Sequence, residues 1–166
     1  MNGWVRGVVA GVVGGVVATG VMTGVFDLWR STRRGRPVRA GGAGWRSPPE
    51  VVAMGRNAHG FEAMDRYCLP NLWSLHLYGY EARLLLDGIE MPVRPGFLGL
   101  TPPGVTMETH YFGISVHIYV HFRLRDGGKQ TRRAPAMQDL GERYDEIYRR
   151  LYGVMRELSR SPDRVN

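Results

Sequence analysis

The sequence predicts a mainly α-helical membrane protein, with a glycine-rich transmembrane helix at the N-terminus, a candidate second span near residues 110–124 and an amphipathic C-terminal helix. Three observations support this prediction: a long uncharged segment within the first thirty residues, arginines directly after it, and a heptad-like apolar pattern beyond residue 135. One anchor helix followed by a small α+β cytoplasmic domain is the alternative.

Composition limits the classes of partner that the chain can have. The chain has 166 residues, a formal net charge of +7 and a single cysteine, which excludes an internal disulfide. A basic excess can attract nucleic acid, anionic lipid or acidic proteins. We expect no nucleic-acid binding, because the sequence has no basic stretch with interleaved aromatic residues.

The N-terminal segment has the length and character of a membrane-spanning helix. No charged residue occurs between Gly7 and Phe26, and about twenty apolar residues span a ~30 Å hydrocarbon core. Trp4 and Trp29 flank this segment, where aromatic rings favour the membrane interfaces. A cleaved signal peptide with a small-residue site near Ala18 is the alternative, but the apolar run continues beyond that site.

Small residues recur along this segment at a spacing that places them on one helix face. In lipid, a face without side chains lets a second helix approach closely. We therefore expect the chain to form a homo-oligomer or to join a larger membrane complex. The residues assigned to this helix-packing face are Gly7, Gly11, Gly14, Gly15 and Ala18.

Arginines after the apolar segment predict the orientation of the chain. Five arginines lie between residues 30 and 39, whereas Arg6 precedes the segment. Positively charged flanks remain in the cytoplasm. The predicted location is therefore the bacterial inner membrane, with the N-terminus outside and the residues after 30 in the cytoplasm.

Residues 1–30 are the first of five regions that the composition defines. Farther along, Ser47 in a cap position with Glu50 three residues later predicts a helix that ends near Gly60. Apolar residues at helical spacing predict another helix within residues 71–89. The remaining regions are a basic glycine-rich loop (31–47), a membrane-associated or α+β core (48–134), an amphipathic helix (135–160) and a tail (161–166).

Residues 110–124 are compatible with two structures. Apolar residues alternate with polar or small ones from Phe112 to Phe122, which favours a β-strand. As a helix, the segment would place His110, His117 and His121 on one face, where they could bind a transition metal or haem. In a strand, His117 and His121 would share a face but lie about 13 Å apart, too far to join one ion.

The C-terminal region has the clearest helical pattern. Its apolar residues alternate between steps of three and four, as in a heptad seam. Such a stripe can pack on the chain's own domain or on a partner helix, so both interpretations remain open. The residues assigned to this second helix-packing face are Leu140, Tyr144, Ile147 and Leu151.

Short motifs in the chain resemble a known family. The N-terminal motifs are Arg6-Gly7, Ala10-Gly11, Ala18-Thr19-Gly20, Met22-Thr23 and Pro48-Pro49-Glu50. The later motifs are His76-Leu77-Tyr78-Gly79, Leu98-Gly99-Leu100-Thr101-Pro102-Pro103, Phe112-Gly113 and Val116-His117. Together they resemble the YagU-like small bacterial inner-membrane proteins. The resemblance implies several membrane spans, with residues 113–122 in one of them, and no catalytic residues; Glu81, Arg83 and the C-terminal helix depart from the family pattern.

These features favour a non-catalytic function. The sequence contains no phosphate-binding glycine loop, no His-Glu-x-x-His motif and no nucleophile elbow, so we assign no catalytic residue. The favoured hypothesis is a small integral membrane protein that anchors or assembles other subunits through helix–helix contacts in the lipid bilayer. The alternatives are a histidine-ligated metal- or haem-binding membrane protein and a membrane-anchored β domain that binds a small apolar ligand.

Overall fold

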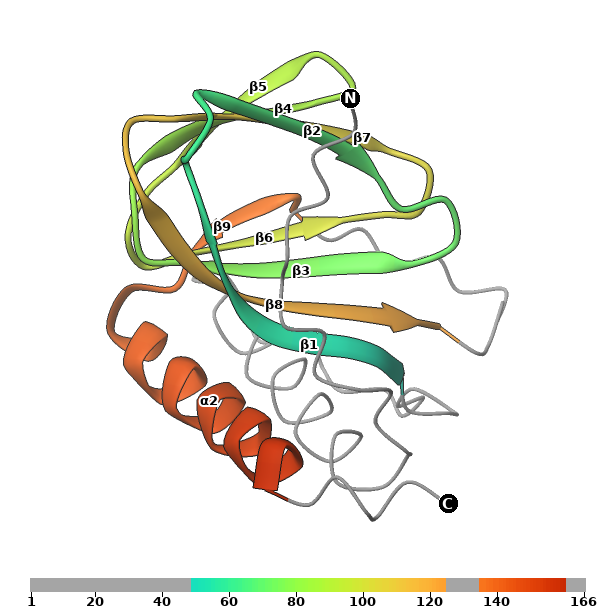
Figure 1. Ribbon diagram of the computed structural model, residues 1–166, viewed down its shortest axis with the longest axis vertical. Helices are drawn as coiled ribbons and strands as arrows, with labels where there is room; N and C mark the ends of the chain where they lie inside the picture. The colour runs from blue at the N-terminus through green and yellow to red at the C-terminus, as the bar shows by residue number, and fades with distance from the viewer. Residues whose placement is uncertain (1–48, 125–134, 161–166) are drawn as a thin grey trace, which may run out of the picture.

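The computed structural model describes residues 49–124 and 135–160. These residues form two antiparallel β-sheets that face one another, with an α-helix across the outer face of the larger sheet (Figure 1). The strand order is β1-β8-β3-β6-β9 in the larger sheet and β2-β7-β4-β5 in the smaller one. The described architecture is therefore a β-sandwich with a helix packed on one side.

The elements have the following bounds. The larger sheet contains β1 (Glu50–His59), β8 (Ser115–Arg123), β3 (Trp73–Tyr78), β6 (Phe97–Thr101) and β9 (Met137–Asp139). The smaller sheet contains β2 (Met64–Cys68), β7 (Thr106–Tyr111), β4 (Ala82–Leu86) and β5 (Ile89–Val93). The short 3-10 helix η1 (Gly141–Arg143) leads into α2 (Tyr144–Arg160).

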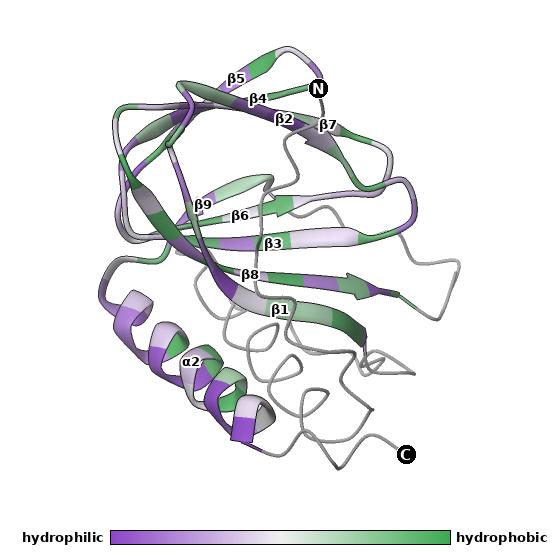
Figure 2. Cartoon of the chain, in the orientation of Figure 1, coloured by the Kyte–Doolittle hydropathy of each residue, from purple (hydrophilic) through white to green (hydrophobic). Residues whose placement is uncertain are grey.

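Two neighbouring strands, β3 and β8, give the larger sheet two different faces. Successive side chains of a strand point to opposite faces, and hydropathy alternates along both strands (Figure 2). Leu75 lies opposite Val120, and Leu77 lies opposite Ile118, so the aliphatic side chains form one continuous layer. The residues between them, which are mostly histidine and tyrosine, point toward the smaller sheet.

Helix α2 covers the aliphatic face of the larger sheet. Ile147, Leu151 and Val154 are buried in one cluster with the aliphatic residues of β3 and β8, and Leu140 joins this cluster just before the helix. Each fully buried side chain of this size stabilises the fold by about 1.5–3 kcal/mol. The apolar stripe of the C-terminal helix thus packs on the chain's own sheet, and Tyr144 lies at its margin.

The predicted fold class is wrong, because the described residues form a β-sandwich rather than a bundle of membrane helices. Within the described ranges, no helix has both the length and the apolar character needed to cross a membrane. The hypothesis of a helical anchoring subunit depended on such helices, and the predicted inner-membrane location depended on the N-terminal segment and its arginines. Both predictions are contradicted by the β-sandwich of the described residues. The N-terminal segment, with its helix-packing face from Gly7 to Ala18, lies outside the described residues.

Two predicted helices are strands in the structure. The segment expected to be a helix up to Gly60 is β1, and the helix expected over 71–89 is replaced by β3, β4 and the start of β5. Apolar residues from different strands happened to fall at helical spacing along the chain. Asp87 and Gly88 have positive φ values of 46° and 83° and form the two-residue turn between β4 and β5. Such an Asp-Gly pair between apolar runs is a hairpin signal.

Residues 110–124 contain the strand that their alternation favours. Ser115–Arg123 is β8, and the end of β7 precedes it. The membrane helix that the family resemblance implied over residues 113–122 is therefore absent from this part of the described chain. A strand pairs on both sides here, with β1 and with β3, so its backbone groups are satisfied within the sheet.

The connections β1–β2 and β7–β8 touch at Gly60, which generates a stability prediction. A Cβ added to Gly60 would lie 2.1 Å from the carbonyl oxygen of Gly113, and φ at Gly60 is +84°. Gly88 has nearly the same φ, +83°, but open space around it. We expect Gly88→Ala to lower the free energy of unfolding by about 1–2 kcal/mol from backbone strain alone. Gly60→Ala should cost roughly 1–3 kcal/mol more, because the clash with Gly113 adds to the strain.

Urea denaturation followed by tryptophan fluorescence measures both losses under the same conditions. Gly88→Ala serves as the matched control, since it changes the same residue type at the same φ. Equal losses of unfolding free energy in the two variants would show that the close approach of Gly60 to Gly113 does not constrain the β1–β2 and β7–β8 connections.

Candidate functional site

The interior of the sandwich has an apolar half and a polar half. The apolar half lies under β4 and β5, where Leu84, Leu86, Val93 and Met107 are buried together. The polar half lies between β1, β8 and β3 on one side and β2 and β7 on the other. We call this second group the His–Tyr cluster; its members are His59, Asp65, Tyr67, Ser74, His76, Tyr78, Tyr80, Tyr111, His117, Tyr119 and His121.

His76 lies at the centre of the cluster and is almost completely buried. Its ring centroid is 4.7 Å from that of His117 and 6.4 Å from that of His121. Its Nε2 atom has a hydrogen bond of 3.1 Å with the hydroxyl of Tyr67, and its Nδ1 atom lies 3.4 Å from the hydroxyl of Tyr78. Burial lowers the pKa of His76 well below its usual value, and the neighbouring histidines lower it further. The ring is therefore neutral at pH 7.

The two histidines of β8 are also held in the neutral form. Burial lowers the pKa of His117 to about 3, helped by the neighbouring His59 and His121. Burial lowers the pKa of His121 to about 4. The hydroxyl of Tyr80 has a hydrogen bond of 3.0 Å with Nδ1 of His117.

The tyrosines around these histidines keep their protons. Burial raises the pKa of Tyr67, Tyr80 and Tyr111 far above the usual phenol value. The deep part of the cluster is thus a set of uncharged hydrogen-bonding rings, which can orient a polar group but carries no charge of its own at pH 7.

The most solvent-accessible hydrogen-bonded pair of the cluster lies at its edge, where β1 ends and β2 begins. Nδ1 of His59 donates a hydrogen bond of 2.9 Å to Oδ2 of Asp65. The His59 side chain is 16% exposed and that of Asp65 33%, so solvent reaches this pair. The pair joins an imidazole to a carboxylate, the arrangement in which a carboxylate fixes the tautomer and orientation of a histidine.

The structure separates the three histidines that the sequence grouped as metal ligands. His117 and His121 share the inner face of β8, as expected for a strand, and His76 contacts both of them from β3. His110 belongs to the opposite face of β7 and has a hydrogen bond of 2.8 Å with Glu108. The structure therefore brings His117 and His121 together with His76 and places His110 on the other face of the smaller sheet.

The described histidines do not form a metal site in their present orientations. Among the described residues, no group of three or more His, Cys, Asp or Glu side chains is arranged to hold a metal ion. The rings of His59 and His117 stack at 4.8 Å with an angle of only 9° between their planes. Imidazole lone pairs lie in the ring plane, so two stacked rings do not converge on one ion.

The sequence prediction missed His59 and His76. Both lie in segments that we expected to be helical, and a helix would have scattered their neighbours over several faces. The alternation of Ser74, His76 and Tyr78 with leucines is the signal that a strand interpretation would have used. Nothing in the sequence alone points to the contact of His59 with Asp65, because it depends on the turn between β1 and β2.

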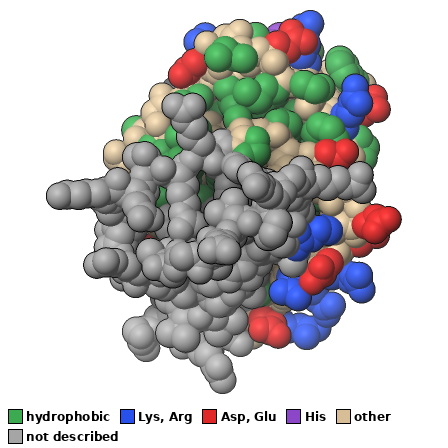
Figure 3. Space-filling model, turned by 180° about the vertical axis from the view of Figure 1, so that it is seen from behind, with side chains coloured by type: hydrophobic (Ala, Val, Ile, Leu, Met, Phe, Trp, Pro, Cys, Tyr) green, Lys and Arg blue, Asp and Glu red, His purple; other side chains and the backbone are tan. Residues whose placement is uncertain are grey.

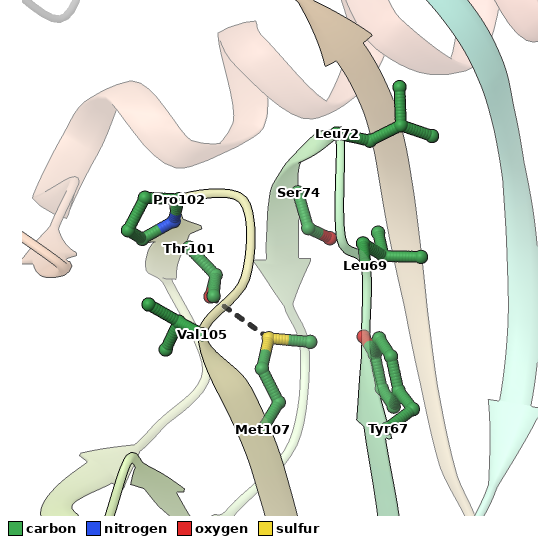
Figure 4. A pocket seen from close by; sticks show the side chains of 8 residues that line it. All are labelled: Tyr67, Leu69, Leu72, Ser74, Thr101, Pro102, Val105 and Met107. Atoms are coloured by element: carbon green, nitrogen blue, oxygen red, sulfur yellow. Dashed lines mark hydrogen bonds between the residues drawn. The ribbon is translucent and has the colours of Figure 1, made fainter.

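A small depression lies at the other end of the sandwich, between the β2–β3 and β6–β7 connections (Figure 4). The empty space measured there, about 160 Å³, includes open solvent, and the depression itself leaves no room for a water-sized molecule. Thr101 donates a hydrogen bond of 2.9 Å to the sulfur of Met107 within it. Tyr67 and Ser74, which contact His76, form its polar side. In its present shape the depression therefore offers no cavity for a ligand.

Comparisons with known proteins give only distant likenesses. No protein-family model matches the chain, and no curated protein matches it. Similar solved structures are the EutQ protein of Clostridium difficile (17% identity, TM-score 0.39, 46% of this chain and 60% of that one), a predicted oxalate decarboxylase of Thermotoga maritima (13%, 0.40, 45% and 68%) and the YhaK protein of Escherichia coli (16%, 0.44, 66% and 51%). The chain spans less than two thirds of the first and third of these proteins. TM-scores below 0.5 support no inference about function.

The neutral histidines generate a prediction for acid stability. In the unfolded chain a histidine takes up a proton near pH 6.5, whereas His76, His117 and His121 resist protonation in the folded state. Folding stability should therefore be constant above about pH 6.5 and fall as the pH drops toward 4, by about 1.4 kcal/mol per pH unit for each such histidine.

Urea denaturation at a series of pH values tests this dependence. His117→Gln should make the decline between pH 6 and 4.5 shallower by about 1.4 kcal/mol per pH unit. Ile89→Ser changes an exposed side chain that does not titrate and should leave the slope as it is in the wild type. A slope that is the same in all three proteins would contradict the assignment of a neutral buried His117.

Proposed function

We propose that the described domain binds a small organic molecule beside His59 and transfers a proton to or from it. In this proposal His59 is the general acid–base group and Asp65 positions it. The observation that carries the proposal is the 2.9 Å hydrogen bond between His59 Nδ1 and Asp65 Oδ2 at the accessible edge of a neutral cluster. The sequence favoured a non-catalytic protein because it contains no known catalytic motif. This pair joins residues from two different strands and so forms no such motif.

The hydrogen bonds of His59 support one tautomer. Nδ1–H donates to the Asp65 carboxylate, which leaves Nε2 as the acceptor. The side-chain amide of Asn57 donates to Nε2 at 3.0 Å, which agrees with the same tautomer. The Asn57 carbonyl oxygen accepts a hydrogen bond of 3.0 Å from the backbone N–H of Ala58, so its amide is fixed. A substrate or water that takes the place of the Asn57 amide would meet a lone pair that is ready to accept a proton.

Aromatic neighbours hold the His59 ring in place. His117 stacks on it at 4.8 Å, and Tyr111 lies at 5.7 Å with an angle of 14° between the planes. Tyr111 also has a hydrogen bond with Asp65, so the carboxylate is oriented from a second direction. A general base whose orientation is fixed before the substrate arrives loses little entropy in the reaction.

The chain contains a natural control for this pair. His110 and Glu108 lie at a nearly equal distance, 2.8 Å, with comparable side-chain exposure of 32% and 28%. They lie on the outer face of the smaller sheet, and the described structure shows no ring stacked on His110. Any reactivity that depends on the cluster should therefore belong to His59 and not to His110.

Hydrolysis of p-nitrophenyl acetate tests the proposal, since an accessible imidazole cleaves this ester, by attack of its nitrogen on the carbonyl carbon or by removing a proton from the attacking water, and acetate and p-nitrophenolate are released. We expect the wild type to release p-nitrophenolate faster than an equal concentration of free imidazole. His59→Gln should lower this rate at least about tenfold, because it removes the base. Asp65→Asn should lower it by a smaller factor, because the ring remains but its tautomer is no longer fixed.

His110→Gln is the matched control and should leave the rate unchanged. Thermal unfolding of each variant shows whether the fold is retained. A wild-type rate no greater than that of free imidazole, or an equal loss in His59→Gln and His110→Gln, would contradict the proposed function.

A further inference from the structure

Large apolar side chains are exposed at the same end of the sandwich as His59. Phe61, Phe112 and Ile114 are 72%, 73% and 70% exposed. They account for three of the five large hydrophobic residues that are exposed within the described ranges, and Met64, a fourth, is close to them in sequence. Seen from behind, hydrophobic side chains lie openly on the upper part of the molecule, which contains the smaller sheet (Figure 3). Exposed apolar groups that gather in one place mark binding surfaces more often than isolated ones do.

The three side chains belong to two connections that are in contact. Phe61 is in the β1–β2 connection, and Phe112 and Ile114 are in the β7–β8 connection. The backbone N–H of Tyr111 donates a hydrogen bond of 3.0 Å to the carbonyl oxygen of Ala63, which ties the two connections together. We call the surface formed by Phe61, Phe112 and Ile114 the apolar corner.

The apolar corner adjoins the acid–base pair along the chain. His59 ends β1 two residues before Phe61, and Asp65 is the second residue of β2 beyond the same connection. Tyr111, which contacts both His59 and Asp65, directly precedes Phe112. Phe61 therefore lies between His59 and Asp65 in the sequence, and Phe112 follows a neighbour of both residues.

The size of the apolar corner favours a small ligand over a protein partner. An aromatic side chain offers roughly 150–250 Å² of surface, so three side chains exposed to this degree provide about 300–500 Å². A stable protein–protein interface needs about 800 Å² from each partner. An alkyl chain or a single aromatic ring is of the size that this corner can cover.

We propose that the apolar corner binds the alkyl or aryl part of the molecule on which His59 acts, so that the substrates are small compounds with an apolar tail next to the reacting group. This inference rests on the proposed function, since it takes His59 as the reacting residue. It adds a substrate class and assigns Phe61 and Phe112 to substrate binding.

Binding of octanamide and acetamide tests the inference separately from catalysis, because these two amides differ only in the length of the apolar tail. Calorimetry with the full chain should show that the wild type binds octanamide at least about tenfold more tightly than acetamide. The double variant Phe61→Ser, Phe112→Ser should lose this preference. Ile89→Ser is the matched control, because Ile89 is 66% exposed at the start of β5, away from the apolar corner, and the preference should remain.

The esters p-nitrophenyl acetate and p-nitrophenyl octanoate give the catalytic readout. The KM for the octanoate should be lower than that for the acetate in the wild type and in Ile89→Ser, and similar to it in the double variant. The kcat for the acetate should be the same in the wild type and in Ile89→Ser within about twofold, since Ile89 lies outside the apolar corner and the reacting group is unchanged.

The outcomes distinguish the two proposals. If His59-dependent hydrolysis is present but the preference for the longer chain is absent or survives the double substitution, the inference is wrong and the proposed function stands. If octanamide binds through Phe61 and Phe112 but no His59-dependent hydrolysis occurs, the proposed function is wrong and the corner binds a ligand that is not a substrate. If sedimentation shows a dimer that the double substitution dissociates, the occupant is a second copy of the chain and the inference is wrong.

Discussion

The alternation of side chains along β3 and β8 is the constraint on which the rest of the structure depends. A strand must send successive side chains to opposite faces, so these two strands divide the protein into an aliphatic layer under α2 and a layer of histidine and tyrosine between the sheets. A shift of one residue in their pairing would place Leu75 and Leu77 in the polar layer and His76 against the helix. The helix packing, the neutral histidines and the position of His59 all follow from this one register.

The polar interior has a thermodynamic cost that an aliphatic interior would avoid. Burying an imidazole or a phenol without a partner costs free energy, and hydrogen bonds such as those of His76 with Tyr67 and of His117 with Tyr80 offset much of this cost. The hydrogen-bonded pair of His59 and Asp65 lies at the accessible edge, where desolvation is smaller. Departures of this kind from an apolar core are expected at functional sites, where chemistry rather than stability determines the residues.

Parts of the fold could be predicted from local patterns. The alternation from Phe112 to Phe122 favoured the strand that became β8, and the heptad-like stripe identified the apolar face of α2 from Tyr144 onward. The helix expected over 135–160 was wrong in its first part, where residues 137–143 form β9, Leu140 and η1. The helix expected over 71–89 was wrong because apolar residues of β3 and β4 fall at helical spacing along the sequence, although the two strands belong to different sheets. The uncharged N-terminal segment dominated the prediction of the fold class, although it lies outside the residues that the structure describes.

The candidate site was less accessible to sequence analysis than the fold. His117 and His121 were singled out correctly as residues on one face of a strand, but their partners come from distant parts of the chain. His76 contacts them from β3. His59 stacks on His117 from β1, which pairs with β8 at nine positions. Contacts of this kind depend on which strands pair, and the local pattern of a single sequence does not contain that information.

The protonation and tautomeric states of the five histidines, measured through the ring nitrogens by NMR as a function of pH, test the central claim most directly. The structure requires His76, His117 and His121 to remain neutral at pH 6, while His59 carries its proton on Nδ1 in the neutral form. If His76, His117 and His121 instead titrate near pH 6.5 like solvent-exposed imidazoles, the histidine layer is not enclosed between the sheets and the account is wrong.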